Sequence, residues 1–372
     1  MKVAIVHDYL KEYGGAERVL KTLTEMYPTA PIYTAFRVKG STADKAFTGK
    51  KIIESKLSSF LKVGKLYSPL RFLIPTIWGS FDLSEYDLVI TSCSWYITRG
   101  FKVGKNTKVV SYCHTPPRWL YGFQTSVGFT RLWPVKIYAA IVGHFMRLYD
   151  FKTAQEIPNW IANSKNVAGR IKKFYKKNST VIYPPVEVKK IMNATRSIEK
   201  KDFYLIVSRL VGAKGIEVAV EAAEKLGINL KIVGEAHGFS DVEKRIKNTN
   251  KGKVELLGYI SDEEKFKLMA QAKAFIALAK DEDFGMTAVE AQAAGTPVIA
   301  YNGGGFKESV IEGKTGVLIN EISTKSLKTA IGKIKKTKWN KKTLITNAKR
   351  FSKEVFIGEI KRYINPILPT RF

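Results

Sequence analysis

The sequence has few cysteines, no long apolar run and a shortage of acidic residues. Cys93 and Cys113 are the only cysteines, and their spacing suits neither a disulfide framework nor a metal site. A reducing, cytosolic compartment therefore fits best. No run of 18 apolar residues exists, which argues against a membrane-spanning helix. The chain leads directly from Met1 and Lys2 into a short apolar run at residues 3–6, so we expect no signal peptide.

The shortage of acidic residues leaves a formal net charge of +29, which is unevenly distributed. Residues 101–200 hold 18 Lys and Arg against 4 Asp and Glu, residues 201–300 hold 14 against 15, and residues 301–350 hold 12 against 3. Such a field favours a polyanionic neighbour, either nucleic acid or an anionic membrane leaflet. Aromatic and basic residues are interleaved in residues 60–67 and 71–78, which suits contact with lipid headgroups. The alternative is a lysine-rich surface without any partner.

The order of apolar runs predicts two α/β domains. At 372 residues, with 45% hydrophobic residues, the chain can bury two cores. Short β-branched runs alternate with helical stretches, which is typical of parallel sheets covered by helices. We expect strands at residues 3–6, 32–35, 88–91, 108–111, 160–162, 180–182, 203–207, 230–233, 254–256, 274–277, 298–300 and 316–319.

A linker and a terminal helix complete the predicted organisation. Residues 183–186 and the charged stretch up to residue 201 indicate a linker. We therefore predict Rossmann-like domains at residues 1–185 and 186–352. Residues 353–372 then carry an amphipathic helix that could pack on either domain, and we suggest the N-terminal domain. Ligands of such sheets bind beyond the carboxyl ends of the strands. Two facing domains would form a cleft lined by the loops after Val6, Ser111, Val207 and Ala277.

The segment of residues 282–290 is the most informative. Phe284 and Gly285 interrupt regular structure, Thr287 can cap a helix, and Glu290 follows it at the spacing of a capping box. Glu282 would then lie in the loop before a helix N-terminus, whose free N–H groups favour anions. An anion flanked by two carboxylates suggests a nucleotide sugar, because carboxylates accept hydrogen bonds from sugar hydroxyls. The alternative is that Glu290 only completes a capping box and Glu282 is solvated.

Two loops of the first half carry further candidates. Gly14 and Gly15 open a helix after the first strand and would let a phosphate approach the backbone, although such a pair is often only a turn. The loop does not have the G-x-G-x-x-G pattern of dinucleotide-binding proteins. His114 ends another strand before a proline-rich loop, where it can bind substrate or have a structural role. Arg118 is a candidate for contact with a phosphate of donor or acceptor.

Cations follow the first strand of the second half. Arg209 and Lys214 are separated by a flexible loop and can converge on a diphosphate. There they would neutralise the negative charge that grows on a departing nucleoside diphosphate. A glycine-rich turn at residues 302–308 is expected close to the 282–290 segment. The acidic run at residues 281–283 superficially resembles a metal site, but it adjoins a helix N-terminus, so we expect no metal.

Together these motifs resemble retaining glycosyltransferase family 4, whose GT-B fold has two facing Rossmann-like domains and an interdomain cleft. The resemblance covers nearly the whole chain and is carried by residues 14–18, 114–116, 209–215, 282–290, 293–300, 304–305 and 308. Residues 161–164 and 181–186 resemble the mannosyltransferase branch, in which GDP-mannose is a common donor. Ala288 departs from the proline of many relatives, which is only a preference at the first turn of a helix.

The resemblance implies roles for the matched positions. In the donor site, Glu290 would hold the ribose, Glu282 the transferred sugar, Arg209 and Lys214 the diphosphate, and Tyr259 the base. The backbone amides of Phe284, Gly285, Met286 and Thr287 would meet the sugar and the diphosphate. Gly14 and Gly15 would lie against the diphosphate. His114 would contact the sugar near the reacting carbon. The family uses neither a metal nor another cofactor and retains the anomeric configuration.

We therefore expect an enzyme that moves a sugar, with mannose as the suggested example, from a nucleoside diphosphate to an acceptor hydroxyl. The expected acceptor is a growing glycan on a polyprenyl-type lipid carrier. The expected location is the cytoplasmic face of the cell membrane, to which the protein would bind peripherally. One alternative is a nucleic-acid-binding protein with a vestigial cleft, although no recognised nucleic-acid module is present. Another is a nucleotide-sugar epimerase or phosphorylase on the same fold.

Overall fold

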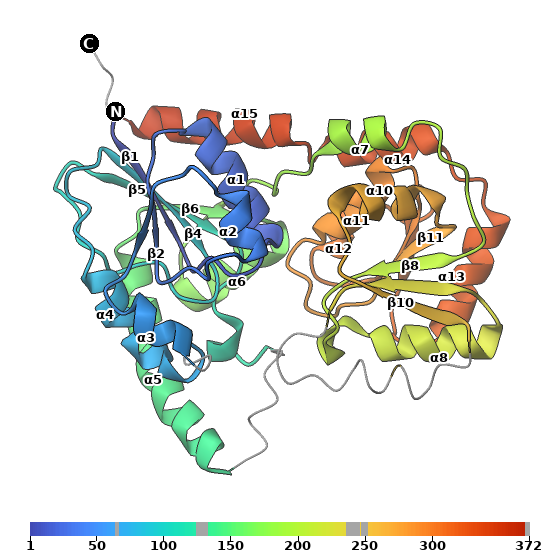
Figure 1. The fold of residues 1–372 in the computed structure, drawn as a ribbon, viewed down its shortest axis with the longest axis horizontal. Coiled ribbons are helices and arrows are strands. Elements are labelled where there is room, and N and C mark those ends of the chain that lie inside the picture. Colours follow the sequence, from blue (N-terminus) through green and yellow to red (C-terminus); the bar gives the residue numbers. More distant parts are fainter. Residues whose placement is uncertain (64–66, 124–132, 236–245, 247–251, 369–372) are drawn as a thin grey trace. The chain divides into compact units, whose positions relative to one another are not determined.

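The computed structural model describes residues 1–63, 67–123, 133–235, 246 and 252–368 (Figure 1). These residues divide into two units. The first unit comprises residues 1–123, 133–185 and 356–368, and the second comprises residues 186–355. In the described part of the chain, no helix is long and apolar enough to cross a membrane.

The first unit is built on a parallel sheet of seven strands with the order β3-β2-β1-β4-β5-β6-β7. Its strands are β1 Val3–His7, β2 Ile32–Thr34, β3 Ile52–Glu54, β4 Leu88–Cys93, β5 Lys108–Cys113, β6 Asn159–Ala162 and β7 Thr180–Val181. Its helical segments are α1 Gly15–Met26, α2 Thr42–Ala46, α3 Ser58–Lys62, η2 Pro69–Leu73, α4 Ile74–Gly79, η3 Arg118–Leu120, α5 Trp133–Gln155, α6 Lys165–Tyr175 and η6 Asn365–Ile367. The central strands are buried along their length, as expected for a parallel sheet covered on both faces.

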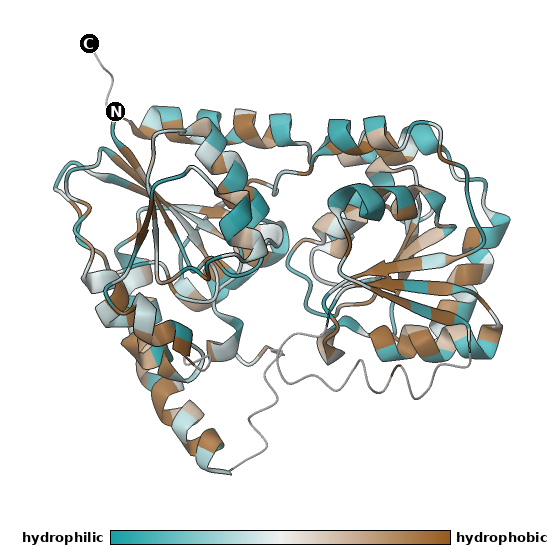
Figure 2. Cartoon of the chain, in the orientation of Figure 1, coloured by the Kyte–Doolittle hydropathy of each residue, from teal (hydrophilic) through white to brown (hydrophobic). Residues whose placement is uncertain are grey.

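The second unit contains a parallel sheet of six strands with the order β10-β9-β8-β11-β12-β13. Its strands are β8 Tyr204–Val207, β9 Leu230–Val233, β10 Val254–Gly258, β11 Ala274–Ala277, β12 Val298–Tyr301 and β13 Gly316–Ile319. Its helical segments are α7 Val188–Ala194, η5 Gly212–Lys214, α8 Ile216–Leu226, α10 Asp262–Gln271, α11 Met286–Ala293, α12 Phe306–Ser309, α13 Thr324–Lys336 and α14 Lys341–Lys349. Apolar residues concentrate on the strands in Figure 2.

Each predicted strand is present, and the predicted α/β class is confirmed. The short strand β3 was not predicted. The expected linker was partly wrong, because residues 188–194 form α7, in which Val188 and Ile191 are buried. The C-terminal helix α15, Lys353–Ile364, buries Phe356, Ile360 and Ile364 in a core of the first unit.

The strand order of each sheet reverses once. In the first unit the chain moves outward from β1 through β2 to β3 and then returns to pair β4 with β1. In the second unit it moves from β8 through β9 to β10 and then returns to pair β11 with β8. Loops diverge at the carboxyl ends of strands where the order reverses, which leaves a crevice suited to ligands.

The predicted interfacial segment at residues 71–78 was largely wrong. Ile74, Ile77 and Trp78 are fully buried in the core of the first unit, because α4 turns them inward. Phe72 is the large apolar residue of this segment that is exposed. The other predicted interfacial segment, residues 60–67, includes residues 64–66, which lie outside the described residues; Phe60 and Val63 are exposed.

Candidate functional site

The loops that follow β8 and β11 meet at the point of strand reversal in the second unit. Lys214 ends η5 after β8, and Glu282 lies in the loop between β11 and α11. The Lys214 Nζ donates a hydrogen bond to the Glu282 Oε2 over 2.7 Å. Both side chains are about one-fifth exposed, at 23% and 20%. A ligand that binds at the carboxyl ends of β8 and β11 would therefore meet a cation and a carboxylate that are already positioned.

The glycine-rich turn after β12 packs against the Glu282 loop, as the sequence predicted. The Gly305 N–H donates to the Glu282 carbonyl over 2.9 Å. A Cβ on Gly304 would lie 2.4 Å from that same carbonyl oxygen, and one on Gly305 would lie 2.3 Å from the Phe284 Cα. Only glycine therefore allows these two backbones to touch. This close packing fixes the loop that carries Glu282.

Helix α11 begins earlier than the sequence predicted. Its N-cap is Gly285 and its first residue is Met286, so Thr287 does not cap it and Glu290 does not complete a capping box. Gly285 has a φ of +88°, which glycine adopts readily, and an added Cβ would lie 2.6 Å from the Phe306 ring. The cap offers no side-chain oxygen to the first amides of the helix.

Glu290 is buried and lies on the second turn of α11, and not on the first turn that the expected capping box implied. Its Oε2 lies 3.0 Å from the Nζ of Lys265, which in turn lies 2.9 Å from the Oδ1 of Asp262. The approach of Lys265 to Oε2 is an ion pair without hydrogen-bond geometry, and Oε2 makes no hydrogen bond among the described residues. The charge of the buried Glu290 carboxylate is therefore compensated by Lys265.

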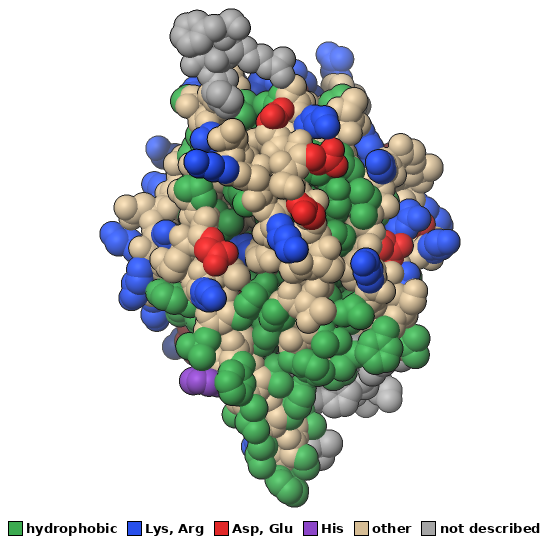
Figure 3. All heavy atoms as spheres, turned by 90° about the vertical axis from the view of Figure 1, so that its left-hand side faces the viewer, with side chains coloured by type: hydrophobic (Ala, Val, Ile, Leu, Met, Phe, Trp, Pro, Cys, Tyr) green, Lys and Arg blue, Asp and Glu red, His purple; other side chains and the backbone are tan. Residues whose placement is uncertain are grey.

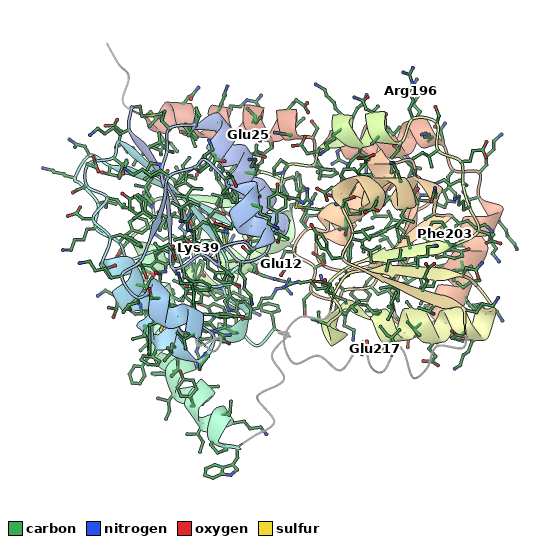
Figure 4. All side chains as sticks on the ribbon, viewed as in Figure 1. Glu12, Glu25, Lys39, Arg196, Phe203 and Glu217 are labelled. Carbon is green, nitrogen blue, oxygen red and sulfur yellow. The ribbon has the colours of Figure 1, made fainter. Side chains whose placement is uncertain are left out.

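The remaining predicted donor residues differ in exposure. Arg209 is exposed directly after β8, and within the described ranges no ion pair or hydrogen bond of its side chain is found. Tyr259 follows β10 and is 67% exposed. Met286 and Thr287 are half-buried at the start of α11, whereas Phe284 is buried. Figure 4 labels Glu217, which lies in the first turn of α8 just after Lys214 and Gly215.

A chain of polar contacts marks the corresponding edge of the first sheet. The Oγ of Ser92 lies 3.0 Å from the His7 Nδ1 and 2.8 Å from the His114 Nε2. The His7 Nε2 in turn lies 3.4 Å from the Glu17 Oε1. His7 is the last residue of β1, Ser92 is the last but one of β4, and His114 directly follows β5; the three strands are neighbours in the sheet. The parallel registers therefore bring together residues that are far apart in sequence.

His114 is held neutral by its surroundings. Burial, together with the neighbouring His7, lowers the pKa of His114 to about 3. A neutral imidazole both donates and accepts hydrogen bonds. Within the described residues, only Nε2 of the His114 ring is hydrogen bonded. Its Nδ1 keeps its hydrogen-bonding capacity for a ligand.

The glycine pair and the arginine of the first unit also have defined places. Gly14 is the N-cap of α1, with Gly15 as the first residue, and the Glu17 Oε2 accepts from the Gly14 N–H over 2.9 Å. Gly14 has an extended backbone, so its value lies in its small size and not in a special φ. Figure 4 labels Glu12, which precedes it in the loop after β1. Arg118 is half-buried at the start of η3.

Three residues of this edge were not predicted from the sequence. His7 and Ser92 connect to His114. The sequence feature that could have revealed them is a polar residue near the end of an otherwise apolar strand. Asp8 is buried; its Oδ2 accepts from the Ser94 Oγ and from the Ser94 and Trp95 amides. Burial raises the pKa of Asp8. These contacts position the loop after β4 beside the loop after β1.

Metal ligands do not cluster in the described part of the chain. No group of three or more His, Cys, Asp or Glu side chains there is arranged to hold an ion. The Cys93 and Cys113 thiols are both buried at paired positions of β4 and β5. Lys214 and Arg209 follow β8 and are cationic side chains on the loop that leads to α8.

Comparisons with known proteins show which proteins this chain is similar to. Residues 187–351 match the family model described as Glycosyl transferases group 1. An uncharacterized glycosyltransferase of Methanocaldococcus jannaschii is 29% identical over 215 residues, which cover 58% of this chain and 59% of that relative. The match thus spans less than two thirds of that protein. The alpha-1,3/1,6-mannosyltransferase ALG2 of Dictyostelium discoideum is 25% identical over 406 aligned positions, which cover 94% and 93% of the two chains.

The solved structures agree on the fold. HepE of Anabaena, in complex with UDP and glucose, aligns with a TM-score of 0.67 over 98% of this chain and 99% of that chain. The sequence identity is 18%, so this likeness shows the fold alone. The predicted resemblance to GT-B glycosyltransferases is confirmed by the family match and by this architecture.

Proposed function

We propose that this chain, whose residues 187–351 match the family model described as Glycosyl transferases group 1, is a retaining and metal-independent hexosyltransferase. It moves a sugar from a nucleoside diphosphate to a hydroxyl of a glycan or lipid-linked acceptor. The observation that carries the proposal is the Lys214–Glu282 pair beside the uncapped N-terminus of α11. A diphosphate needs cations and amides, and a sugar needs a hydrogen-bond acceptor, and this crevice offers all three.

The roles follow from the chemistry of each group. Lys214 has three N–H donors, so it can keep Glu282 in place while it binds a phosphate oxygen. Arg209 adds a second cation as negative charge grows on the leaving diphosphate. The amides at Met286 and Thr287 contribute the positive end of a helix dipole. The carboxylate of Glu282 accepts hydrogen bonds from hydroxyls of the transferred sugar.

Transfer with retention places the acceptor on the face from which the diphosphate leaves. The bond between the anomeric carbon and the phosphate oxygen breaks, the bond to the acceptor oxygen forms, and the acceptor proton passes to the departing phosphate. In the first unit, the neutral His114 offers its Nδ1 to a sugar hydroxyl while Ser92 holds its Nε2. Under this proposal Tyr259 stacks on the base and Glu290 binds the ribose.

The sugar and the acceptor are proposed from the relatives and from the charge of the chain. The mannosyltransferase relative supports mannose, and hence GDP-mannose, whereas the Anabaena structure holds UDP and glucose. A lipid-linked acceptor at the cytoplasmic membrane face is supported by the net charge of +29. We therefore propose peripheral attachment to an anionic membrane surface as part of the same function.

Three measurements test the proposal. Thermal unfolding with GDP-, UDP- and ADP-sugars identifies the donor, because a ligand that binds only the folded state raises the melting temperature. Release of nucleoside diphosphate is then followed with and without membrane extract as the acceptor source. We expect release to depend on the acceptor, and the product to keep the anomeric configuration by NMR. Conversion of the donor without an acceptor would favour an epimerase, and an inverted product would contradict retention.

A further inference from the structure

Helix α5 presents apolar side chains to solvent along most of its length. The exposed large residues are Trp133, Ile137, Tyr138, Ile141, Phe145, Leu148 and Phe151, with exposed fractions between 39% and 72%. Five of them recur every three or four residues, at positions 133, 137, 141, 145 and 148, so they form one stripe. Figure 3 shows hydrophobic side chains gathered on the projecting part of the first unit, where α5 lies in Figure 1.

The first half of α5 does not belong to the core. None of residues 133–142 is buried, and the buried positions of the helix begin at Gly143. The second half is anchored by Met146 and by Asp150, which pairs with the buried Arg99. The first half is tied to η2 by a hydrogen bond from the Tyr138 hydroxyl to the Pro69 carbonyl. An apolar helix segment that is held in place but left uncovered indicates a binding surface.

The sequence on either side of this segment carries charges of one sign. No acidic residue occurs between Asp87 and Asp150, whereas this interval contains eight Lys and Arg residues. Lys136 is exposed on α5 itself, and His144 lies on the same helix. The neighbouring η2 adds the exposed Phe72, in a segment without acidic residues from position 55 to position 81. An apolar surface with cationic flanks complements an anionic lipid leaflet.

We propose that the α5 surface, formed by Trp133, Ile137, Ile141, Phe145, Leu148 and Phe72, inserts into the headgroup and acyl boundary of an anionic lipid bilayer. Residues 133–148 would span about 24 Å as a helix, less than the roughly 30 Å of a hydrocarbon core. The exposed stripe is therefore too short to cross the membrane, and the buried positions from Gly143 onward hold the helix to the first unit, so the stripe lies in the interface. This inference deepens the proposed function. Only its link to a lipid-linked acceptor rests on that function, because lipid binding can be measured without turnover.

The test is sedimentation of the full-length chain with phosphatidylcholine vesicles that contain or lack phosphatidylglycerol. The test variant is Ile137→Glu with Phe145→Glu, at two exposed positions of the stripe. The control is Ile311→Glu with Val355→Glu, which adds the same charge at exposed apolar positions outside α5. Thermal unfolding and the nucleotide-sugar melting shift show that both variants are folded.

We expect the wild type and the control to bind vesicles with phosphatidylglycerol, more weakly at high salt. The α5 variant should lose at least about tenfold in partitioning, because two apolar anchors are removed and two like charges are added. Equal binding of all three proteins would overturn the proposal. The proposal would also be overturned if light scattering showed a dimeric wild type and a monomeric α5 variant, and neither protein bound vesicles. If the wild type bound duplex DNA and the α5 variant did not, the surface would be assigned to nucleic acid and the lipid proposal would be overturned. Lipid binding without any transfer activity would contradict the proposed function but not this surface.

Discussion

The Lys214 Nζ and the Glu282 Oε2 lie 2.7 Å apart and join the loop after β8 to the loop after β11. The two residues are 68 positions apart in sequence and meet because β8 and β11 are neighbours in the sheet. Ion pairs that remain accessible to solvent contribute little to folding, typically about 0.2–1 kcal/mol. The position of this pair at the strand reversal therefore points to a role in ligand binding rather than in stability.

Glu282→Ala is expected to lower turnover by at least about a hundredfold while the melting temperature stays nearly constant, because an oriented acceptor is lost at the transferred sugar. Lys214→Ala is expected to lower both turnover and donor affinity. Steady-state kinetics and thermal unfolding measure these effects. The matched control is Lys225→Ala, which breaks an exposed pair with Glu221 on α8 and should leave kinetics unchanged. Wild-type turnover by Glu282→Ala would remove this carboxylate from the mechanism.

Transfer should continue in EDTA, because Lys214 and Arg209 supply the positive charge that a metal would otherwise give to the leaving diphosphate. The assay compares initial rates with EDTA, without additions and with Mg²⁺. Arg209→Ala should reduce the rate by about tenfold or more under all three conditions. Loss of activity in EDTA with recovery in excess Mg²⁺ would show that the cations do not suffice.

Gly305→Ala is expected to destabilise the second unit by about 2 kcal/mol or more, since the new Cβ would lie 2.3 Å from the Phe284 Cα. The displaced backbone carries Glu282, so donor affinity should fall as well. Chemical denaturation measures the free energy of unfolding. The control is Gly332→Ala within α13, where a Cβ meets no atom within 4 Å and the helix should gain about 0.5–1 kcal/mol. An unchanged stability of Gly305→Ala would mean that the two loops are not packed as described.

His114 should contribute to loss of stability in acid. Its pKa is about 3 in the folded chain and 6.5 as the ordinary value, so between these pH values the unfolded chain binds a proton that the folded chain does not. The free energy of unfolding therefore falls as the pH decreases from 6.5 to 3. In His114→Gln this decrease should be smaller than in the wild type, as denaturation at several pH values would show. His144→Gln, which removes an exposed histidine of α5, controls for the loss of any histidine. Parallel pH profiles of wild type and His114→Gln would contradict the assignment.

Local pattern was sufficient for the strands but not for the start of α11. The buried strands of a parallel sheet are continuous β-branched runs, which are visible in the sequence. The cap of α11 was misassigned to Thr287 because a hydroxyl at the right spacing is a strong local signal. The N-cap lies at Gly285 because its left-handed backbone and the nearby Phe306 ring require glycine there, and local sequence shows neither feature.

The exposed stripe of α5 shows the same limit. Its residues are as apolar as those of core helices, and composition alone does not separate the two cases. Ile74, Ile77 and Trp78, which we expected at an interface, are core residues, whereas Ile137 and Phe145 are exposed. Burial depends on which elements surround a helix, so only packing distinguishes them.

The α/β class and the resemblance to GT-B glycosyltransferases could be predicted from the sequence, because they depend on runs of neighbouring residues. Packing was needed to bring Lys214 to Glu282, to place Ser92 between His7 and His114, and to bury Glu290 beside Lys265. Those contacts join residues that strand order and helix packing bring together from distant parts of the chain. Their distances follow from the pairing of whole strands, which no short segment encodes.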